Sequence, residues 1–246
     1  MNEYEKVLFI PDIHCPFQDN RALEVLYSFM DWYKPDTIFI MGDVLDCYAI
    51  SRFTKDPNGE LKFQEELDEA TNILRKIRHK AKKAKIYLLR GNHELRVQKF
   101  LWTNAKALSG LHALEVESLL GLHKLDIEYI KEGSLRYHGL MIKHGSIVRK
   151  FSGYTAKGEF EDNGCSGVSG HSHRLSIYRQ TNSGGEYIWV EAGHLCNPKQ
   201  EYLEGKVANW QQGWALGWFK KNSKRYHLET INLVNYKAFY GGKEFE

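Results

Sequence analysis

The sequence predicts an α/β fold whose first hundred residues build a largely parallel sheet and whose second half adds mostly antiparallel strands. Up to about residue 100, short runs of apolar, β-branched residues alternate with longer segments in which apolar residues recur every three or four positions. Beyond residue 187, strand patterns follow one another without long helical segments between them. The first arrangement favours right-handed crossovers and parallel strands, whereas the second favours antiparallel pairing.

The first half contains five predicted elements, each with its own signature. Short runs rich in Val, Ile and Phe are typical of buried strands, and the first of them ends at Pro11, which cannot donate to a sheet ladder. Between these runs, apolar residues at helical spacing predict helices that pack by one face. In chain order the expected elements are a strand at Val7–Ile10, a helix at Leu23–Tyr33, a strand at Thr37–Met41, a helix at Phe63–Ala81 and a strand at Ile86–Leu89.

The second half is expected to contain two helical segments and a series of strands. The Leu-rich stretch Leu95–Gly133 is predicted to be helical and to shape access to the neighbouring sheet edge. Tyr154–Asn163 is predicted to add a short helix and loop. The expected strands are Arg136–Lys143, Gly167–Ser169, Ile188–Val190, Ala215–Phe219 and Tyr226–Leu233.

The whole chain, residues 1–246, is expected to form one domain, because it contains no repeat, low-complexity tract or Pro/Ser-rich linker. Its four cysteines are scattered without a CxxC pair, which indicates a reducing, cytoplasmic setting. Neither a signal-peptide pattern nor an apolar run of the roughly 20 residues that span a bilayer is present, so no membrane partner is expected. A net charge of +3 does not by itself indicate nucleic acid. The pattern predicts no particular oligomeric state.

Five short polar blocks each follow an apolar run. They supply carboxylates, an amide oxygen and imidazoles, which are ligands that Mn, Fe, Zn and Co accept. In an open α/β sheet the carboxyl ends of the strands meet at one edge, where loops form a ligand crevice. Segments far apart in the sequence can therefore meet at one site. The blocks are Asp12-Ile13-His14, Gly42-Asp43, Gly91-Asn92-His93-Glu94, His144-Gly145 and Gly170-His171-Ser172-His173.

The residue types and order of these blocks resemble the calcineurin-like metallophosphoesterases, whose pattern is DxH, GDxxD, GNHE, a lone His and GHxH. All five blocks are present, in order, between residues 12 and 173. The resemblance implies a β-sandwich of mixed sheets flanked by helices, with the site at the carboxyl ends of the strands, and it covers nearly the whole chain. The segment 209–214 also resembles small phosphoesterases that are often encoded by phages.

The resemblance further implies a site for two divalent metal ions. Manganese is the expected ion, and iron, zinc, nickel or cobalt are alternatives because N/O ligands accept several metals. Asp43 would bridge the two ions, with one carboxylate oxygen on each. One ion would be held by Asp12, His14, Asp43 and His173, and the other by Asp43, Asn92, His144 and His171.

In such a centre a hydroxide that bridges the ions attacks phosphorus in line. The resemblance implies that His93 donates a proton to the leaving oxygen and that Asp46 orients His93 and favours its charged form. The sequence departs from the family's protein phosphatases at one place, because Cys47-Tyr48 stands where they carry Arg-Gly. We therefore expect phosphodiester, nucleotide or nucleic-acid substrates. The alternatives are a phosphomonoesterase that acts on proteins or small molecules, and a non-catalytic scaffold that binds nucleic acid.

Four further features allow two interpretations each. His194 could approach the site or be a hydrogen-bonded loop histidine, and Arg96 could neutralise a substrate phosphate or lie on a helix surface. The basic helix end at residues 76–85 could contact a nucleic-acid backbone, although a solvated face is favoured. Core positions are favoured over base-stacking positions for the regularly spaced tryptophans Trp210, Trp214 and Trp218.

Overall fold

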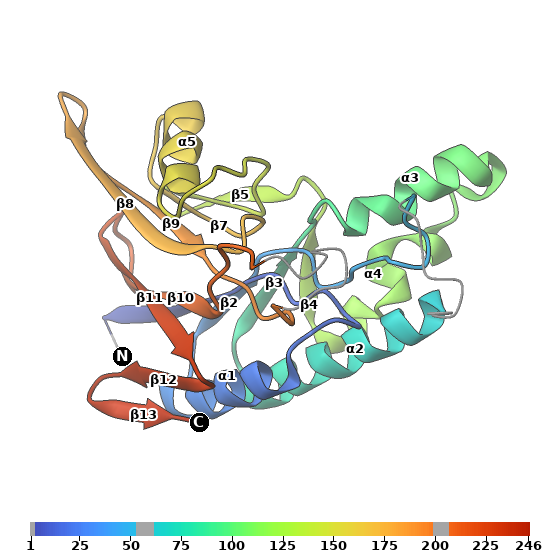
Figure 1. Ribbon diagram of the computed structural model, residues 1–246, viewed down its shortest axis with the longest axis horizontal. Helices are drawn as coiled ribbons and strands as arrows, with labels where there is room; N and C mark the ends of the chain where they lie inside the picture. Colours follow the sequence, from blue (N-terminus) through green and yellow to red (C-terminus); the bar gives the residue numbers. More distant parts are fainter. Residues whose placement is uncertain (1–2, 53–61, 199–206) are drawn as a thin grey trace.

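The computed structural model describes residues 3–52, 62–198 and 207–246. Within these ranges thirteen strands form two sheets, one of eight strands in the order β13-β12-β11-β10-β1-β2-β3-β4 and one of five in the order β5-β6-β7-β9-β8. Figure 1 shows the two sheets stacked on one another, with helices outside them. This architecture confirms the predicted α/β sandwich of mixed sheets flanked by helices.

The first half of the chain forms the parallel part of the larger sheet, as the sequence predicts. Val7 lies opposite Thr37 and Thr37 opposite Lys85, so the first three strands run side by side in the same direction. The side chain of Asp19 caps the first helix by accepting hydrogen bonds from two main-chain N–H groups. The elements are β1 (Tyr4–Ile10), α1 (Asn20–Tyr33), β2 (Thr37–Ile40), α2 (Phe63–Lys80), β3 (Lys85–Leu89) and β4 (Ile127–Ile130).

The last part of the chain extends the same sheet with antiparallel strands. The first of them pairs with β1, with Val7 opposite Gly217, so the N-terminal strand lies in the middle of the sheet. Successive hairpins then carry the chain outward to the sheet edge. These strands are β10 (Gly213–Lys220), β11 (Tyr226–Val234), β12 (Lys237–Tyr240) and β13 (Lys243–Phe245).

The smaller sheet departs from the prediction in two ways. The expected single strand Arg136–Lys143 is wrong, because the chain reverses at His138 and Gly139, whose φ angles are 48° and 87°, and forms a hairpin. The expected antiparallel order holds only at the two ends of this sheet, since its three central strands are parallel. Helix α5 (Tyr154–Asn163) supplies one of the crossovers. The strands are β5 (Ser134–Tyr137), β6 (Leu140–Lys143), β7 (Gly167–Ser169), β8 (Leu175–Asn182) and β9 (Gly185–Ala192).

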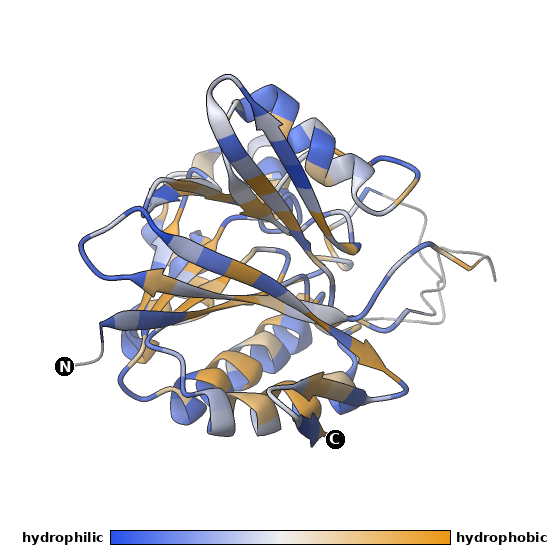
Figure 2. Cartoon of the chain, turned by 90° about the vertical axis from the view of Figure 1, so that its left-hand side faces the viewer, coloured by the Kyte–Doolittle hydropathy of each residue, from blue (hydrophilic) through white to orange (hydrophobic). Residues whose placement is uncertain are grey.

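Alternation along the central strands separates two hydrophobic cores. On β1, Leu8 and Ile10 pack with the helices α1 and α2, whereas Val7 and Phe9 face the smaller sheet. Orange segments in Figure 2 mark apolar residues on these facing surfaces. A third cluster on the outer face of the smaller sheet includes Phe160 of helix α5. The sheet edges at the carboxyl ends of the parallel strands remain free to hold polar loops.

The predicted helical stretch Leu95–Gly133 is helical only in part. It contains α3 (Glu94–Asn104), then short turns of 3-10 and α-helix between residues 106 and 125, and then β4. Gly121, with a φ of 58°, and Asp126, with a φ of 52°, break the helical path. Among the described residues, no helix is both long and apolar enough to cross a membrane.

Candidate metal centre

The five polar blocks meet at one edge of the sandwich. They follow β1, β2 and β3 in the larger sheet and β6 and β7 in the smaller sheet, at the carboxyl end of each strand. Several of their side chains are buried, since Asp12 is 0% exposed, Asp43 is 2% and His144 is 3%, whereas His93 and His171 are partly buried and Asn92 is exposed. Buried charged groups of this kind require partners or a metal ion. All nine residues predicted for the site lie in these loops: Asp12, His14, Asp43, Asp46, Asn92, His93, His144, His171 and His173.

A first group of donors consists of Asp12, His14 and His173, whose ligand atoms lie within 4.8 Å of one another. The Nε2 atoms of the two histidines are 3.0 Å apart, and Asp12 Oδ1 is 3.7 Å from His173 Nε2. Two nitrogens bound at about 2.0–2.1 Å to one ion, at right angles, would lie about 3 Å apart. The spacing therefore fits two ligands of the same cation.

A second group consists of Asp43, His144 and His171, again within 4.8 Å. His144 Nε2 lies 3.2 Å from Asp43 Oδ2 and 3.0 Å from the amide oxygen of Asn92. The amide oxygen adds a neutral ligand to the carboxylate and imidazoles. The structure thus brings together the residues of the second predicted set.

Two of the histidines are held in the tautomer that binds metals through Nε2. His14 Nδ1 donates to Asp46 Oδ2 at 3.1 Å, and His144 Nδ1 donates to the carbonyl oxygen of Met41 at 2.9 Å. Because Nδ1 keeps its proton in both rings, Nε2 is the atom that would bind a metal ion once its own proton is displaced. Such outer partners orient metal-binding imidazoles, which supports the fit of this site to metal ions.

Asp43 lies between the two groups and presents one oxygen to both. Its Oδ2 is 3.8 Å from His14 Nε2 and 3.2 Å from His144 Nε2, whereas Oδ1 accepts a hydrogen bond from the main-chain N–H of His93 at 2.9 Å. Oδ2 is therefore the Asp43 oxygen that lies near histidines of both groups.

The backbone at the centre is strained. His14, Asp43, His171 and His173 have φ angles of 54°, 48°, 66° and 56°, in the left-handed region that non-glycine residues seldom adopt. Each such residue costs on the order of 1–3 kcal/mol and persists only where its surroundings fix it. This strain is concentrated at four candidate ligands, which indicates that the strained backbone positions their side chains at a cost in folding stability.

Glycines allow the loops to approach one another. A Cβ on Gly91 would lie 2.1 Å from Asp43 Oδ1, and a Cβ on Gly42 would lie 2.8 Å from both Gly91 N and His144 Nδ1. Gly42 also has a φ of 97°. Any larger residue at these positions would push the Asp43 loop and its neighbours apart.

Glu94 supports the centre without being a candidate ligand, and the sequence interpretation assigned it no role. Its carboxylate accepts N–H bonds from Gly91 at 2.8 Å, Asp43 at 2.9 Å and Leu45 at 3.1 Å. Burial, followed by the nearby Asp43 charge, raises the pKa of Glu94. An acidic residue at the start of a helix that directly follows Gly-Asn-His is the signal that would have found it.

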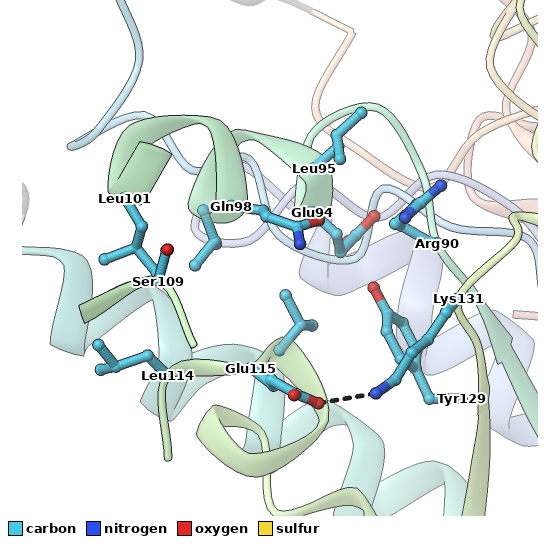
Figure 3. Close-up of a pocket in the computed structure, with 12 residues that line it drawn as sticks. Arg90, Glu94, Leu95, Gln98, Leu101, Ser109, Leu114, Glu115, Tyr129 and Lys131 are labelled. Carbon is cyan, nitrogen blue, oxygen red and sulfur yellow. Dashed lines mark hydrogen bonds and ion pairs between the residues drawn. The ribbon is translucent and has the colours of Figure 1, made fainter. Parts of the chain in front are cut away.

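Glu94 also borders a cavity of about 170 Å³ beneath helix α3. Figure 3 shows this cavity between Leu101, Tyr129 and the ion pair of Lys131 with Glu115. The residues that line it include none of the nine predicted for the site. The cavity therefore adjoins the metal centre only through Glu94 and is not part of the centre.

His93 lies beside the centre with two neighbours that fix its ring. Nδ1 donates to the carbonyl oxygen of Asp46 at 2.8 Å and lies 3.5 Å from Asp46 Oδ2. On the other side of the ring, Arg96 Nη2 donates to Nε2 at 3.0 Å, while Nη1 donates to the Asp46 carbonyl at 2.9 Å. Asp46 therefore holds His93 chiefly through its main chain, while its carboxylate bonds to His14. Arg96 lies at the site rather than on a free helix surface.

The buried carboxylates of the centre need positive charge nearby to compensate them. Burial raises the pKa of Asp12 to about 6. Burial alone would lower the pKa of His144, but the adjacent Asp43 carboxylate raises it to about 10. Burial, and then the positive charge on His144, lowers the pKa of His171 to about 4. A proton on His144 thus compensates buried carboxylates, a role that divalent cations would perform with more charge.

Asp46 keeps its negative charge. Burial would raise the pKa of Asp46, but hydrogen bonds from His14 and His93 lower it well below its usual range. An ionised Asp46 favours the protonated or metal-bound form of His14.

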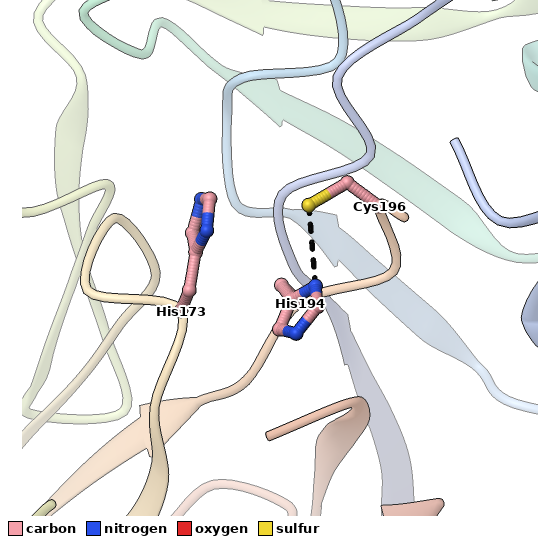
Figure 4. A group of neighbouring side chains, drawn as sticks. All are labelled: His173, His194 and Cys196. Atoms are coloured by element: carbon pink, nitrogen blue, oxygen red, sulfur yellow. Dashed lines mark hydrogen bonds between the residues drawn. The ribbon is translucent and has the colours of Figure 1, made fainter. Parts of the chain in front are cut away.

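His194 approaches the centre and is also hydrogen-bonded, so both interpretations of it hold. Its ring stacks on His173 with centroids 5.2 Å apart, and its Nδ1 lies 3.2 Å from Cys196 Sγ (Figure 4). Within the described residues, His194 Nε2 has no hydrogen-bond partner although the side chain is fully buried. Trp210 contacts both rings, with its centroid 4.3 Å from that of His173 and 5.6 Å from that of His194.

The remaining ambiguous features have structural roles. At the basic helix end, Arg78 donates to the main-chain carbonyls of Ala84 and Leu125, and Lys76 pairs with Glu24 at 2.5 Å. These contacts support the interpretation of residues 76–85 as a solvated helix end that pairs within the protein, in preference to a nucleic-acid contact. Trp214 is fully buried in the core and Trp218 packs against it, as predicted, but the core prediction is wrong for Trp210, which is partly buried against His173.

Comparisons with known proteins agree with the fold and identify a family. A family model described as calcineurin-like phosphoesterase matches residues 5–208. The Gene 54 protein of Mycobacterium phage L5 is 26% identical over 256 residues, covering 98% of this chain and 99% of the relative. The Gene 54 protein of Mycobacterium phage D29 is 29% identical over 227 residues, covering 86% and 88%. Among solved structures, vacuolar protein sorting 29 from Cryptosporidium parvum matches with a TM-score of 0.55 and 14% identity over 99% of both chains, which shows a shared fold alone.

Proposed function

Because the chain belongs to the calcineurin-like phosphoesterase family, we propose that it is a binuclear, metal-dependent phosphoesterase that hydrolyses phosphodiesters, such as those of nucleotides or nucleic acid. The family depends on divalent metals, and the chain contains clusters of suitable donors. One observation carries the proposal above all others. Asp43 Oδ2 lies near histidines of both donor groups, and outer hydrogen bonds turn His14 and His144 Nε2 toward it.

The donor sets assign the ligands. Both groups contain only nitrogen and oxygen donors, which suits manganese and leaves iron, zinc, nickel and cobalt as alternatives. When bound, the ions would polarise a phosphoryl oxygen and supply the bridging hydroxide nucleophile. Asp12, His14, Asp43 and His173 would hold one ion, and Asp43, Asn92, His144 and His171 the other.

His93 is the proposed general acid. The hydrogen bond to the Asp46 carbonyl oxygen keeps a proton on His93 Nδ1. Nε2 is therefore the atom that would deliver a proton to the leaving oxygen. The Asp46 carboxylate lies 3.5 Å from Nδ1 and helps to hold the ring in place. Since Arg96 Nη2 occupies Nε2 at 3.0 Å, the guanidinium must release His93 when substrate binds. Arg96 would then donate to a phosphoryl oxygen.

Arg96 offers a cation where the phosphatase-type arginine is missing. Cys47 stands at that position and is fully buried, so it presents no charge to a phosphate. Arg96 comes instead from helix α3 and meets the same Asp46 loop. A single guanidinium shared with His93 suits the lower charge of a diester better than the dianion of a monoester, which favours the diester.

The experiment that tests the proposal measures metal content and hydrolysis together. After loading with Mn²⁺, purified protein is expected to contain two ions per chain and to hydrolyse bis-p-nitrophenyl phosphate faster than mono-p-nitrophenyl phosphate. A faster rate on the monoester would instead assign a phosphomonoesterase. Absence of both bound metal and turnover would overturn the proposal in favour of a non-catalytic scaffold.

A further inference from the structure

A loop that borders the metal centre combines exposed aromatic rings with positive charge. Residues 146–154 connect the end of the His144 block to helix α5, and they contain Arg149 and Lys150 but no carboxylate. Both cations are exposed, as are Phe151 at 51% and Tyr154 at 60%. Large aromatic side chains with this exposure offer stacking surface that the core does not use.

The two rings form a defined pair. Phe151 and Tyr154 meet edge to face, with centroids 5.4 Å apart and an interplanar angle of 80°. Lys150 Nζ lies 5.3 Å from the Phe151 centroid, so a cation accompanies the aromatic surface. Arg149 is fixed at its main chain, where its N–H donates to Thr155 Oγ1 at 3.0 Å. The loop thus presents rings and cations side by side.

Hydrogen bonds tie this loop to the residues around His173. Gly153 N donates to Glu191 Oε2 at 2.6 Å, and the other oxygen of Glu191 accepts from Ser172 Oγ at 2.7 Å. Arg174 Nη2 donates to the carbonyl oxygen of Lys150 at 3.3 Å. Ser172 and Arg174 flank His173 in sequence, so both ends of the aromatic pair are anchored next to a candidate metal ligand.

A third ring lies between the loop and the centre. Trp210 is half-buried against His173, and the neighbouring Asn209 donates from Nδ2 to the carbonyl oxygen of Lys150 at 3.4 Å. The segment Asn209–Trp210 therefore contacts both the loop and His173.

We propose that residues 146–154 bind single-stranded nucleic acid, with unpaired bases stacked on Phe151 and Tyr154 and backbone phosphates at Arg149 and Lys150. This inference rests on the proposed function, since it places a phosphodiester of the same strand at the metal centre. Stacking on side chains requires bases that are free of a partner strand, because every base presents a π-face but a duplex hides it. The cations complement the backbone charge. A duplex would be excluded from this stacking surface.

The test compares cleavage of fluorescein-labelled oligothymidylate with hydrolysis of bis-p-nitrophenyl phosphate by the manganese-loaded protein. For the double variant Phe151→Ala/Tyr154→Ala we expect kcat/KM on oligothymidylate to fall by about 10- to 100-fold, because stacked bases contribute strongly to binding. The rate on the small diester is expected to stay unchanged. Phe100→Ala/Trp102→Ala removes two comparably exposed rings from helix α3 and is the matched control.

Charge and strandedness give two further readouts. Arg149→Gln/Lys150→Gln is expected to reduce the salt dependence of kcat/KM on oligothymidylate, since fewer counterions are released. Annealing the substrate to oligoadenylate is expected to suppress cleavage. Equal cleavage by the aromatic variant and the wild type, equal cleavage of duplex and single strand, or hydrolysis of the small diester alone would each overturn the inference and leave the phosphoesterase function intact. Failure on both substrates would overturn the function itself.

Discussion

The main-chain N–H of His93 donates a 2.9 Å hydrogen bond to Asp43 Oδ1. This contact joins the loop after β3 to the loop after β2, and it leaves Oδ2 as the oxygen that faces donors of both groups. Glu94 reinforces the join, because its carboxylate accepts the N–H groups of Asp43 and Gly91. The general-acid candidate and the carboxylate that we propose as the bridge are therefore positioned by the same short segment.

Asp43→Asn is expected to lose metal at both positions. The amide would retain the bond from His93 through its oxygen, but it would turn a neutral NH₂ group toward the histidines in place of Oδ2. Metal content measured by inductively coupled plasma mass spectrometry should fall for both equivalents, and activity with it. Asp162→Asn, at an exposed position on helix α5, is the control. Retention of both ions by the Asp43 variant would contradict a bridging role.

His93→Ala is expected to keep the metals and to slow turnover according to the leaving group. Loss of a general acid costs about 10²- to 10⁴-fold when the leaving oxygen needs a proton. The loss should be large for alkyl esters and small for p-nitrophenyl esters, whose leaving anion is stable without protonation. Rates on paired alkyl and p-nitrophenyl diesters measure the difference. An equal loss on both would argue that His93 acts in some way other than proton donation.

Arg96→Ala is expected to lower kcat/KM on phosphodiesters by about 10- to 100-fold, the equivalent of one hydrogen bond to a charged group at about 1.5–3 kcal/mol. The guanidinium donates to His93 Nε2 and to the Asp46 carbonyl oxygen. A phosphoryl oxygen of the substrate would replace His93 Nε2 as its acceptor. Lys99→Ala removes an exposed charge from the same helix and should have little effect. A full rate in the Arg96 variant would show that substrate does not use this cation.

The placement of the site was predictable from sequence because each polar block follows an apolar run. Val7–Ile10 and Thr37–Met41 are unmistakable strands, so Asp12 and Asp43 had to emerge at the same sheet edge. The groups that orient the ligands were not predictable in this way. The carbonyl of Met41, which fixes the His144 tautomer, belongs to a main chain that has no residue-type signature.

The errors in the predicted fold also arise from features that residue types alone do not specify. Arg136–Lys143 alternates like one strand, and only the left-handed backbone at His138 and Gly139 converts it into a hairpin. The parallel pairing of β6 with β7 depends on the crossover through helix α5, whose buried face includes Glu159 as well as apolar residues. Pairing partners of short strands are decided by such tertiary contacts more than by local pattern.

A buried carboxylate outside the centre gives the fold a pH dependence. Glu66 on helix α2 accepts the main-chain N–H of Ala49 at 2.9 Å through Oε1, which anchors the segment that follows Asp46. Its Oε2 has no hydrogen-bond partner among the described residues. Burial raises the pKa of Glu66 from 4.5 to about 7.

Glu66→Gln is therefore expected to raise the unfolding free energy above that of the wild type more at pH 8 than at pH 5. Between pH 4.5 and 7 the native state binds a proton at Glu66 that the unfolded chain releases. The stability from protonated Glu66 is thus fully present below pH 4.5 and is lost as the pH rises through 7. Gln keeps the acceptor for Ala49 and carries no charge, so the variant should gain on the order of 2 kcal/mol in unfolding free energy at pH 8 over wild type. Urea titrations of metal-free protein at both pH values measure the gain, and an equal difference at pH 5 and pH 8 would show that Glu66 ionises in the fold as it does in the unfolded chain.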